Sequence, residues 1–448
     1  MIARTLAFSL VGLAAAAYAA PPIEHWQTSN GARVFFSHAR ELPMVDIRVV
    51  FDAGGARDGV NKGLGVLTNA MLAEGAGGLP AEVISERFED QGAEFKYSAL
   101  RDMAWVSLRS ITENPNLQPS LETLALVLAQ PDFPESAFER QRKRLLVALA
   151  QKRQSPSDLA DEAFYQAAYG DHPYASDPNG TPETLNALKV KDLRQFYQRL
   201  YVARNAVLAI VGDLSKAEAQ AMAKTVIGLL PEGDVPEPLP EVKPPSGPIA
   251  RHLPHPSTQT HIRIGQIGIR RDDPDYFPLY VGNHVLGGSG LVSRLADEVR
   301  EKRGLSYSVS SYFSPMRVSG PFIVGLETKN AQAKEALEVT EATLRAFVEQ
   351  GPTETELTAA VMNLTGGFPL LVDSNAKIVE YIAMIGFYGL PIDFLQTFID
   401  NVRGTARRSI VDAFHRRMAP GRLVTVTVGG NTPQAAARPA TSEKKTPP

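Results

Sequence analysis

The chain has 448 residues, of which 44% are hydrophobic, and a formal net charge of −3. This near-neutral balance gives no electrostatic basis for binding nucleic acid or an anionic membrane surface. Because the sequence contains no Cys, disulfides and Cys-based nucleophiles or metal sites are excluded, and the fold must be held together by core burial.

The first residues have the pattern of a secretory signal peptide. Arg4 precedes a short apolar run, and Ala17-Tyr18-Ala19 supplies the small residues recognised at cleavage. We expect residues 1–19 to be removed and the protein to be exported to the periplasm. No later segment approaches about 18 uninterrupted apolar residues, so the sequence predicts no membrane-spanning helix.

Apolar periodicity predicts alternating strands and helices in the first half of the chain. Strands are predicted at 32–38, 45–52, 94–98 and 104–111. Helices are predicted at 63–74, 81–91, 119–129, 134–153, 157–168, 182–187 and 190–201.

A proline-dense segment, "PEGDVPEPLPEVKPPSGPIARHLPHP" at 231–256, follows these elements. Proline cannot continue a helix or a central strand, so we expect an extended, semi-rigid linker. It separates an N-terminal domain at 20–230 from a C-terminal domain at 257–431. The polar, Pro-rich residues 432–448 are expected to be disordered.

The second half repeats the pattern of the first. Helices are predicted at 275–286, 290–302, 331–350, 353–368 and 375–388, and strands at 305–313 and 320–328. The halves open with "VDIRVVFDAGG" (45–55) and "THIRIGQIGI" (260–269), and close with "NAVLAIVGDL" (205–214) and "RLVTVTVGGN" (422–431). This self-similarity predicts a duplicated α+β unit.

The predicted helix at 63–74 has a frame in which a metal site could be built. Val66, Asn69 and Ala70 are spaced i, i+3, i+4 and share one helix face. An H-x-x-E-H zinc site needs His, Glu and His at this spacing. Val and Ala cannot ligate a metal, and Asn cannot act as a base at neutral pH.

The stretch "GARDGVNKGLGVLTNAMLAEGA" resembles the zinc segment of M16 (pitrilysin or insulinase-type) peptidases, except where the metal chemistry would be. The segment "HPYASDPNGTPETLNALKVKDLRQFYQRLYVARNAVLAIVGDL" (172–214) is similar to a second pattern of that family. The resemblance implies two homologous α/β-roll domains, each an antiparallel sheet flanked by helices, which together form half of a clamshell. Within the family, the chain resembles the small, two-domain branch.

The resemblance also places the family's third zinc ligand, a Glu, on the helix at 134–153. Here that position is Ala148, and Gln141 stands at another position that usually holds Glu. Every expected metal position is lost, so we expect no metal or other cofactor in this chain.

The histidines offer no alternative metal site. His252 and His255 flank Pro254 in the linker and are expected to be solvated. His172 is expected to make a structural hydrogen bond. No G-x-S-x-G elbow, P-loop or G-x-G-x-x-G fingerprint occurs.

The second half contains "REKRGLSY", in which Arg300 and Tyr307 are seven residues apart. M16 members use an Arg and a Tyr at this spacing to reach a zinc site, where they can bind substrate backbone and stabilise an oxyanion. Without that frame, Arg300 would be a solvated residue in the last turn of a helix. Tyr307, alternating with Leu305, Val309 and Phe313 on a strand, would be a core residue.

These patterns predict the non-zinc subunit of a heterodimeric metallopeptidase. The partner would be an H-x-x-E-H homologue that supplies zinc, and Arg300 and Tyr307 would bind peptide substrate there. The strand at 45–52 is similar to a family edge strand that can add a peptide. The alternative is a peptide-binding or scaffold protein with no role in catalysis. A homodimer with residual, non-zinc chemistry has no candidate nucleophile.

Overall fold

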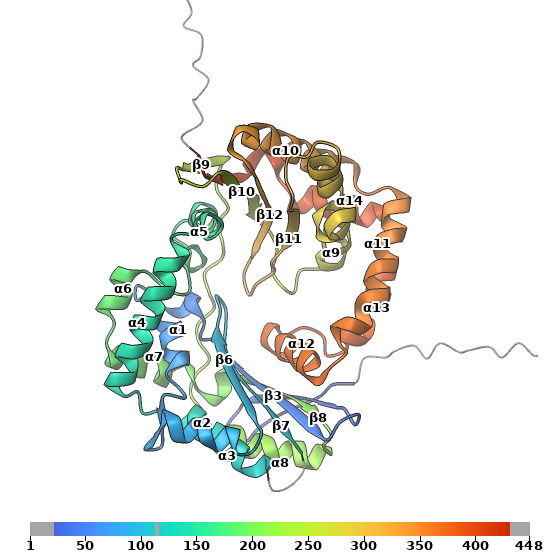
Figure 1. Cartoon of the computed structure of the whole chain (residues 1–448). Coiled ribbons are helices and arrows are strands. Elements are labelled where there is room, and N and C mark those ends of the chain that lie inside the picture. Colours follow the sequence, from blue (N-terminus) through green and yellow to red (C-terminus); the bar gives the residue numbers. More distant parts are fainter. Residues whose placement is uncertain (1–21, 113–115, 431–448) are drawn as a thin grey trace, which may run out of the picture.

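The computed structural model describes residues 22–112 and 116–430 (Figure 1). The signal-peptide prediction for residues 1–19 and the predicted tail at 432–448 lie outside the described residues. Two sheets lie at opposite ends of the molecule, with helices on their faces and between them.

The first half builds a six-stranded sheet. In order across the sheet, the strands are β1 (Glu24–Gln27), β2 (Arg33–His38), β8 (Ala206–Gly212), β3 (Met44–Phe51), β7 (Ala104–Ile111) and β6 (Glu94–Ala99). All neighbours are antiparallel except β2 and β8, which are parallel. The helices are α1 (Leu64–Ala70), α2 (Ala81–Glu89), α3 (Leu117–Ala129), α4 (Glu135–Lys152), α5 (Pro156–Tyr169), α6 (Pro182–Ala187), α7 (Val190–Leu200) and α8 (Lys216–Ile227).

The prediction that residues 45–52 form an edge strand is wrong. The strand exists as β3, but β8 pairs with one side of it and β7 with the other. β8 begins more than 150 residues after β3, so a reading of local pattern could not place it there. The unpaired edge on this side of the sheet belongs to β6.

The second half builds a five-stranded sheet. In order, the strands are β11 (Val309–Phe313), β12 (Pro321–Lys329), β10 (Gln259–Ile267), β13 (Val424–Val428) and β9 (Ile249–Leu253). The α-helices are α9 (Tyr276–Asn283), α10 (Ala333–Gln350), α11 (Glu354–Gly367), α12 (Asn375–Tyr388), α13 (Phe394–Arg403) and α14 (Arg407–Arg417). The predicted helix at 290–302 is instead a short 3-10 turn at Gly290–Val292 followed by a π-helical turn at Ala296–Glu301.

The strand orders confirm that the unit is duplicated. The order β2-β8-β3-β7-β6 in the first sheet corresponds to β9-β13-β10-β12-β11 in the second, and β9 and β13 are the equivalent parallel pair. β9 therefore lies within the segment predicted as linker, where it forms a sheet edge and not a central strand.

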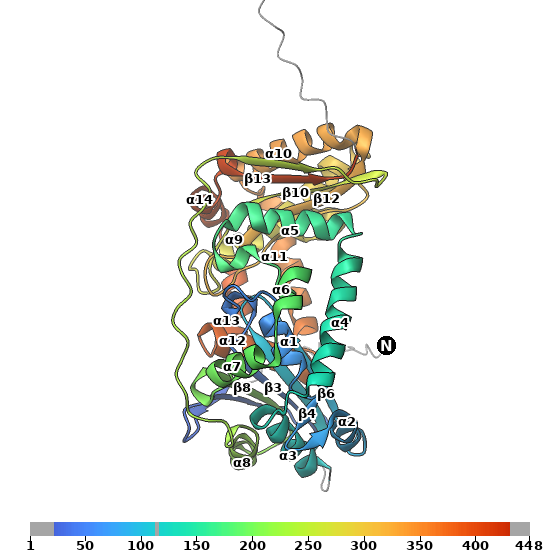
Figure 2. The same ribbon diagram turned by 90° about the vertical axis from the view of Figure 1, so that its left-hand side faces the viewer.

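The two halves exchange one helix each. α5, from the first half, packs on β10 and β13, while α12, from the second half, packs on β8, β3 and β2 (Figures 1 and 2). α12 comes close because a side chain is absent at Gly386, where a Cβ would lie 2.6 Å from both Phe35 and Val207. The halves therefore share their cores and are not joined by the linker alone.

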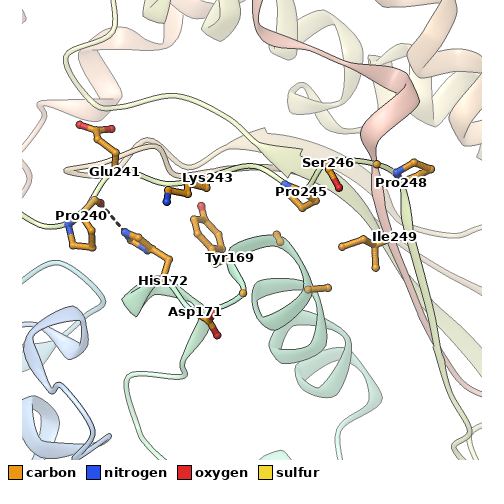
Figure 3. A pocket seen from close by; sticks show the side chains of 14 residues that line it. Tyr169, Asp171, His172, Pro240, Glu241, Lys243, Pro245, Ser246, Pro248 and Ile249 are labelled. Carbon is orange, nitrogen blue, oxygen red and sulfur yellow. Dashed lines mark hydrogen bonds between the residues drawn. The ribbon is translucent and has the colours of Figure 1, made fainter.

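The linker runs along one side of the molecule from α8 to β9 (Figure 2). It is held by the first half: Arg57 donates to the carbonyl of Glu237 at 2.6 Å, and His172 Nε2 lies 2.9 Å from the carbonyl of Pro240. His172 Nδ1 accepts from the backbone N–H of Tyr174 at 3.1 Å, which makes Nε2 the donor. Figure 3 shows the His172 ring directed at Pro240 of the linker, beside the end of α5. The predicted structural hydrogen bond of His172 is therefore confirmed.

Candidate functional site

α1 is fixed at its start by a buried carboxylate. Asp58 accepts hydrogen bonds from the backbone N–H groups of Gly63 and Gly65, each at 2.8 Å. Burial raises the pKa of Asp58 to about 7, against the opposing effect of these backbone donors. The helix is shorter than predicted, ending at Ala70 rather than at residue 74.

Asn69, at the position that the sequence resemblance matches to the Glu of H-x-x-E-H, makes structural hydrogen bonds. Its side chain is buried, with the residue 1% exposed. Nδ2 donates to the carbonyls of Ser98 on β6 and Trp105 on β7, at 2.9 and 3.2 Å, and Oδ1 accepts from the Tyr201 hydroxyl at 3.0 Å. A carboxylate has no hydrogen to offer those carbonyls, so this environment requires an amide.

The other degenerate zinc positions carry no ligand. Val66 and Ala70 are half-buried on α1, and Ala148 is exposed on α4. Gln141 is buried and donates to Glu74, which also accepts from Arg140. No cluster of three or more His, Cys, Asp or Glu side chains able to hold a metal occurs in residues 22–112 and 116–430. The residues on α1 and α4 therefore do not fit zinc.

His252 and His255 are half-buried beside the second sheet and are not simply solvated linker residues. His252 is on β9, with Nδ1 2.9 Å from the hydroxyl of Thr427. His255 Nδ1 accepts from the backbone of Ser257 at 3.2 Å. The earlier expectation is corrected because the strand that carries His252 pairs with β13.

Arg300 and Tyr307 lie together at the surface of the second half. Arg300 is in the π-helical turn, and its guanidinium carbon is 4.6 Å from the centre of the Tyr307 ring. Tyr307 is 79% exposed. The two residues line a recess of about 310 Å³, together with Gln259, Gly304, Leu305, Ser306, Glu327, Thr328, Lys329 and Gln332.

The alternative in which Tyr307 is a core residue of a strand is wrong. β11 begins only at Val309, and Leu305 and Val309 are buried while Tyr307 faces solvent. The backbone departs from the strand because Ser306 donates to the carbonyls of Ser308 and Glu327, at 2.6 and 2.7 Å.

The structure does not bring the two groups of candidate residues together. The recess beside Tyr307 is lined by residues between 259 and 332, and none of its walls comes from α1 or α4. Within the described part of this chain, Arg300 and Tyr307 therefore do not complete a site with Val66, Asn69 or Ala70.

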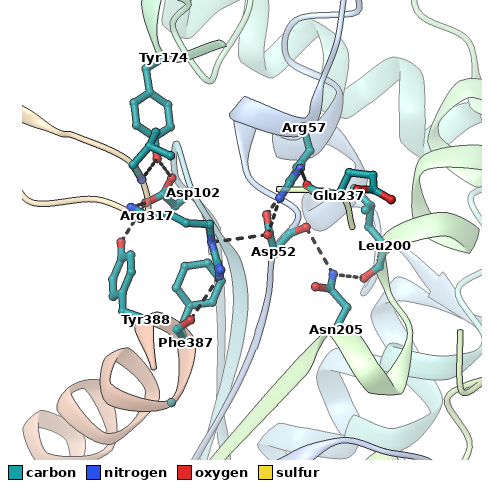
Figure 4. Close-up of polar contacts among 12 residues, drawn as sticks. Asp52, Arg57, Asp102, Tyr174, Leu200, Asn205, Glu237, Arg317, Phe387 and Tyr388 are labelled. Carbon is teal, nitrogen blue, oxygen red and sulfur yellow. Dashed lines mark hydrogen bonds and ion pairs between the residues drawn. The ribbon is translucent and has the colours of Figure 1, made fainter. Parts of the chain in front are cut away.

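Sequence reasoning missed a polar network that joins the halves (Figure 4). The Asp102 carboxylate accepts hydrogen bonds from the hydroxyls of Tyr174 and Tyr388, the latter at 3.1 Å, and from the backbone N–H of Arg317 at 2.8 Å. Burial raises the pKa of Asp102 above its usual range, although these donors oppose the shift. A single Asp in the loop between β6 and β7 gives no periodic signal, so sequence alone could not identify it.

Known proteins match this chain over most of its described length. The family described as Insulinase (Peptidase family M16) matches residues 33–181, and the Peptidase M16 inactive domain matches residues 187–364. The non-peptidase homolog YmxG of Helicobacter pylori is 26% identical over 393 residues, covering 86% of this chain and 89% of that protein. An uncharacterized zinc protease YmxG of Bacillus subtilis is 24% identical, covering 80% of this chain and 86% of that protein.

Solved structures also match this chain. A peptidase M16 inactive domain from Pseudomonas fluorescens superposes with a TM-score of 0.89 and 36% identity, covering 92% of this chain and 98% of that chain. The periplasmic protease PqqL from Escherichia coli, at 15% identity and a TM-score of 0.76, shares the fold; the match covers 92% of this chain and 46% of PqqL. The chain belongs to the M16 peptidase family, as a member whose sequence contains no H-x-x-E-H motif.

Proposed function

We propose that this chain is the non-catalytic subunit of an exported M16 zinc metallopeptidase, and that Arg300 and Tyr307 complete the zinc site of a partner subunit. The observation that carries the proposal is the exposure of Tyr307, at 79%, with Arg300 stacked beside it. A tyrosine retained only for packing would be buried with its neighbours Leu305 and Val309.

The chemistry of this pair suits peptide hydrolysis. A phenol O–H and a guanidinium fork can bind a peptide backbone and stabilise the oxyanion that forms as the scissile carbonyl is attacked. Tyr307 faces solvent and the Arg300 side chain is partly exposed, so a partner could bring its substrate to them. Arg300 pairs only loosely within the described chain, with Nε 3.3 Å from the exposed Glu301.

This chain has no hydrolytic centre of its own in this proposal. Asn69 holds β6 and β7 to α1, and Val66, Ala70 and Ala148 cannot coordinate a metal. The partner, an H-x-x-E-H homologue, would supply the zinc and the general base. Residues 1–19 would direct the chain to the periplasm, where the two subunits would meet. No described helix is both long and apolar enough to cross a membrane.

Peptidase assays on the purified chain, alone and mixed with an H-x-x-E-H homologue from the same genome, test the proposal. We expect hydrolysis only in the mixture, its loss on chelation, and a sharp reduction by Arg300→Ala or Tyr307→Phe. Matched controls are Arg303→Ala, a neighbouring surface arginine paired with Glu298, and Tyr312→Phe, an exposed tyrosine on β11. The absence of both activity and complex formation in the mixture would contradict the proposal.

A second function is favoured by the free edge of β6. This strand pairs only with β7 among the described strands, so a peptide could extend the sheet there by backbone hydrogen bonding. A peptide-binding or scaffold protein would use this edge without any partner's zinc. Peptide binding that survives Arg300→Ala, with no activity in any mixture, would support this function.

A further inference from the structure

A recess of about 560 Å³ lies where the first half, the linker and the second half meet. Its walls come from the turn between β1 and β2, the end of β3, the start of β8, the first linker residues, the tip of the β11–β12 hairpin and the end of α12. It shares no lining residue with the recess beside Tyr307, so its role is independent of the partner subunit proposed above.

Positive charge dominates this junction. The charged residues that line the recess are Arg33, Arg204, Arg317, Asp52 and Glu232. Asp52 is already engaged by Arg57, which donates to both of its carboxylate oxygens at 2.7 and 2.6 Å. Glu232 is exposed and pairs with Arg204 at the rim. Arg317 shares Asp52 with Arg57 through a longer ion pair. Arg33 forms no ion pair among the described residues, so its positive charge is the one left uncompensated in this recess.

These two arginines come from opposite halves and have donors to spare. Among the described residues, the Arg33 side chain makes one hydrogen bond, from Nη1 to the Gly386 carbonyl at 2.9 Å. Arg317 donates Nη2 to the Phe387 carbonyl at 3.2 Å and stacks on the Phe387 ring at 4.1 Å. Its Nε is buried without a hydrogen bond and forms an ion pair with an Asp52 oxygen at 3.5 Å (Figure 4).

The like charges are close enough to affect each other. Burial, and after it the charge of Arg317, lower the pKa of Arg33. Two partly desolvated guanidinium groups that line one recess with Asp52 as the nearby carboxylate repel each other, and a further anion bound there would relieve this repulsion. The two oxygens of a carboxylate or phosphate can accept two parallel N–H hydrogen bonds from one guanidinium group. The ammonium group of a lysine, which acts as a point charge, cannot make this paired contact.

We propose that this recess binds a small organic anion through a carboxylate or phosphate group, held by Arg33 and Arg317 and covered at the rim by Arg204. The volume is typical of a small-molecule site and exceeds what a single phosphate ion needs. Val235, an exposed lining residue, provides apolar surface for the organic part. Because Arg33 and Arg317 come from different halves, the anion that they bind would stabilise the junction between the halves.

Thermal unfolding and isothermal titration calorimetry of the full chain test this proposal with three probes: inorganic phosphate, glycerol 3-phosphate and citrate. Sodium chloride at matched ionic strength is the reference. At 10 mM, at least one probe should raise Tm by about 1–3 °C above that reference. A response to the phosphates alone identifies a phosphate site, and a response to citrate alone identifies a carboxylate site.

Variants locate the binding. Arg33→Gln should weaken the binding of the active probe roughly 10- to 100-fold, the effect of losing a charged, bidentate contact. Arg204→Gln, at the exposed rim, should weaken the binding of the same probe several-fold. This variant tests the proposal if Arg33→Gln does not fold. Arg408→Gln makes the same charge change on an exposed helix surface far from the recess lining and should bind like wild type. Equal binding by all four proteins, or no response to any probe, would overturn the proposal.

Discussion

Replacing Asn69 on α1 by Asp exchanges the side-chain NH2 group for an oxygen and leaves the size of the side chain almost unchanged. The two carbonyls of Ser98 and Trp105 that now accept from Nδ2 would face an oxygen in a site that is 1% exposed. Leaving a buried group without its partner costs about 1–3 kcal/mol. Two such losses predict that the free energy of unfolding falls by about 2–6 kcal/mol at pH 7.

The sign of the pH dependence follows from burial. The new carboxyl would have a folded-state pKa above its unfolded value of about 4, because it is desolvated and faces carbonyl oxygens. Its contribution to stability is fully present below that unfolded pKa and is lost as pH rises through the folded pKa. The deficit of Asn69→Asp relative to wild type should therefore be smaller at pH 4 than at pH 7.

Urea unfolding followed by tryptophan fluorescence measures this deficit, since Trp105 lies beside the affected bonds. Asn401→Asp, at an exposed position in α13, makes the same chemical change and should alter stability by less than about 0.5 kcal/mol. If Asn69→Asp lies within about 1 kcal/mol of wild type at pH 7, the structural role assigned to Asn69 is refuted.

Two further predictions concern stability. The pKa of Asp58 is raised to about 7, so its contribution to stability is present below about pH 4 and is lost as pH rises through 7. In the wild type, this loss lowers the free energy of unfolding by as much as about 4 kcal/mol between pH 4 and pH 8. In Asp58→Asn, the free energy of unfolding should change less over this pH range. Gly386→Ala should destabilise the chain by about 1–3 kcal/mol in urea, because the added methyl meets Phe35 and Val207. Gly366→Ala, in open space on α11, should be neutral or slightly stabilising, and equal effects of the two changes would contradict the helix-exchange account.

Much of the architecture could be predicted because the local pattern of apolar and polar residues indicates it. The strands β2, β3, β6 and β7 and the long helices α4 and α10 follow from apolar periodicity, and the duplication from two similar opening and closing strands. The pairing of those strands is non-local. Local pattern therefore predicts β3 as an edge strand, although β8 pairs with it.

The candidate site was predictable to a different degree. That Val66, Ala70 and Ala148 cannot ligate zinc follows directly from the chemistry of their side chains. The exposure of Tyr307 could not be predicted from the sequence, because hydrogen bonds of Ser306 turn the backbone before β11 begins. Nor could the junction of Asp102 and Arg317 be foreseen, since their positions are 215 residues apart and meet only once α12 and the β11–β12 hairpin are in place.

The most direct test of the central claim is kcat/KM for peptide hydrolysis by the assembled pair of subunits, with wild-type chain and with Tyr307→Phe at concentrations that saturate the partner. The proposal predicts that the complex forms equally well and that kcat/KM falls by about 100-fold, as expected for losing one donor to a developing oxyanion. An unchanged kcat/KM in a complex that forms normally would contradict the claim that this chain contributes to its partner's active site.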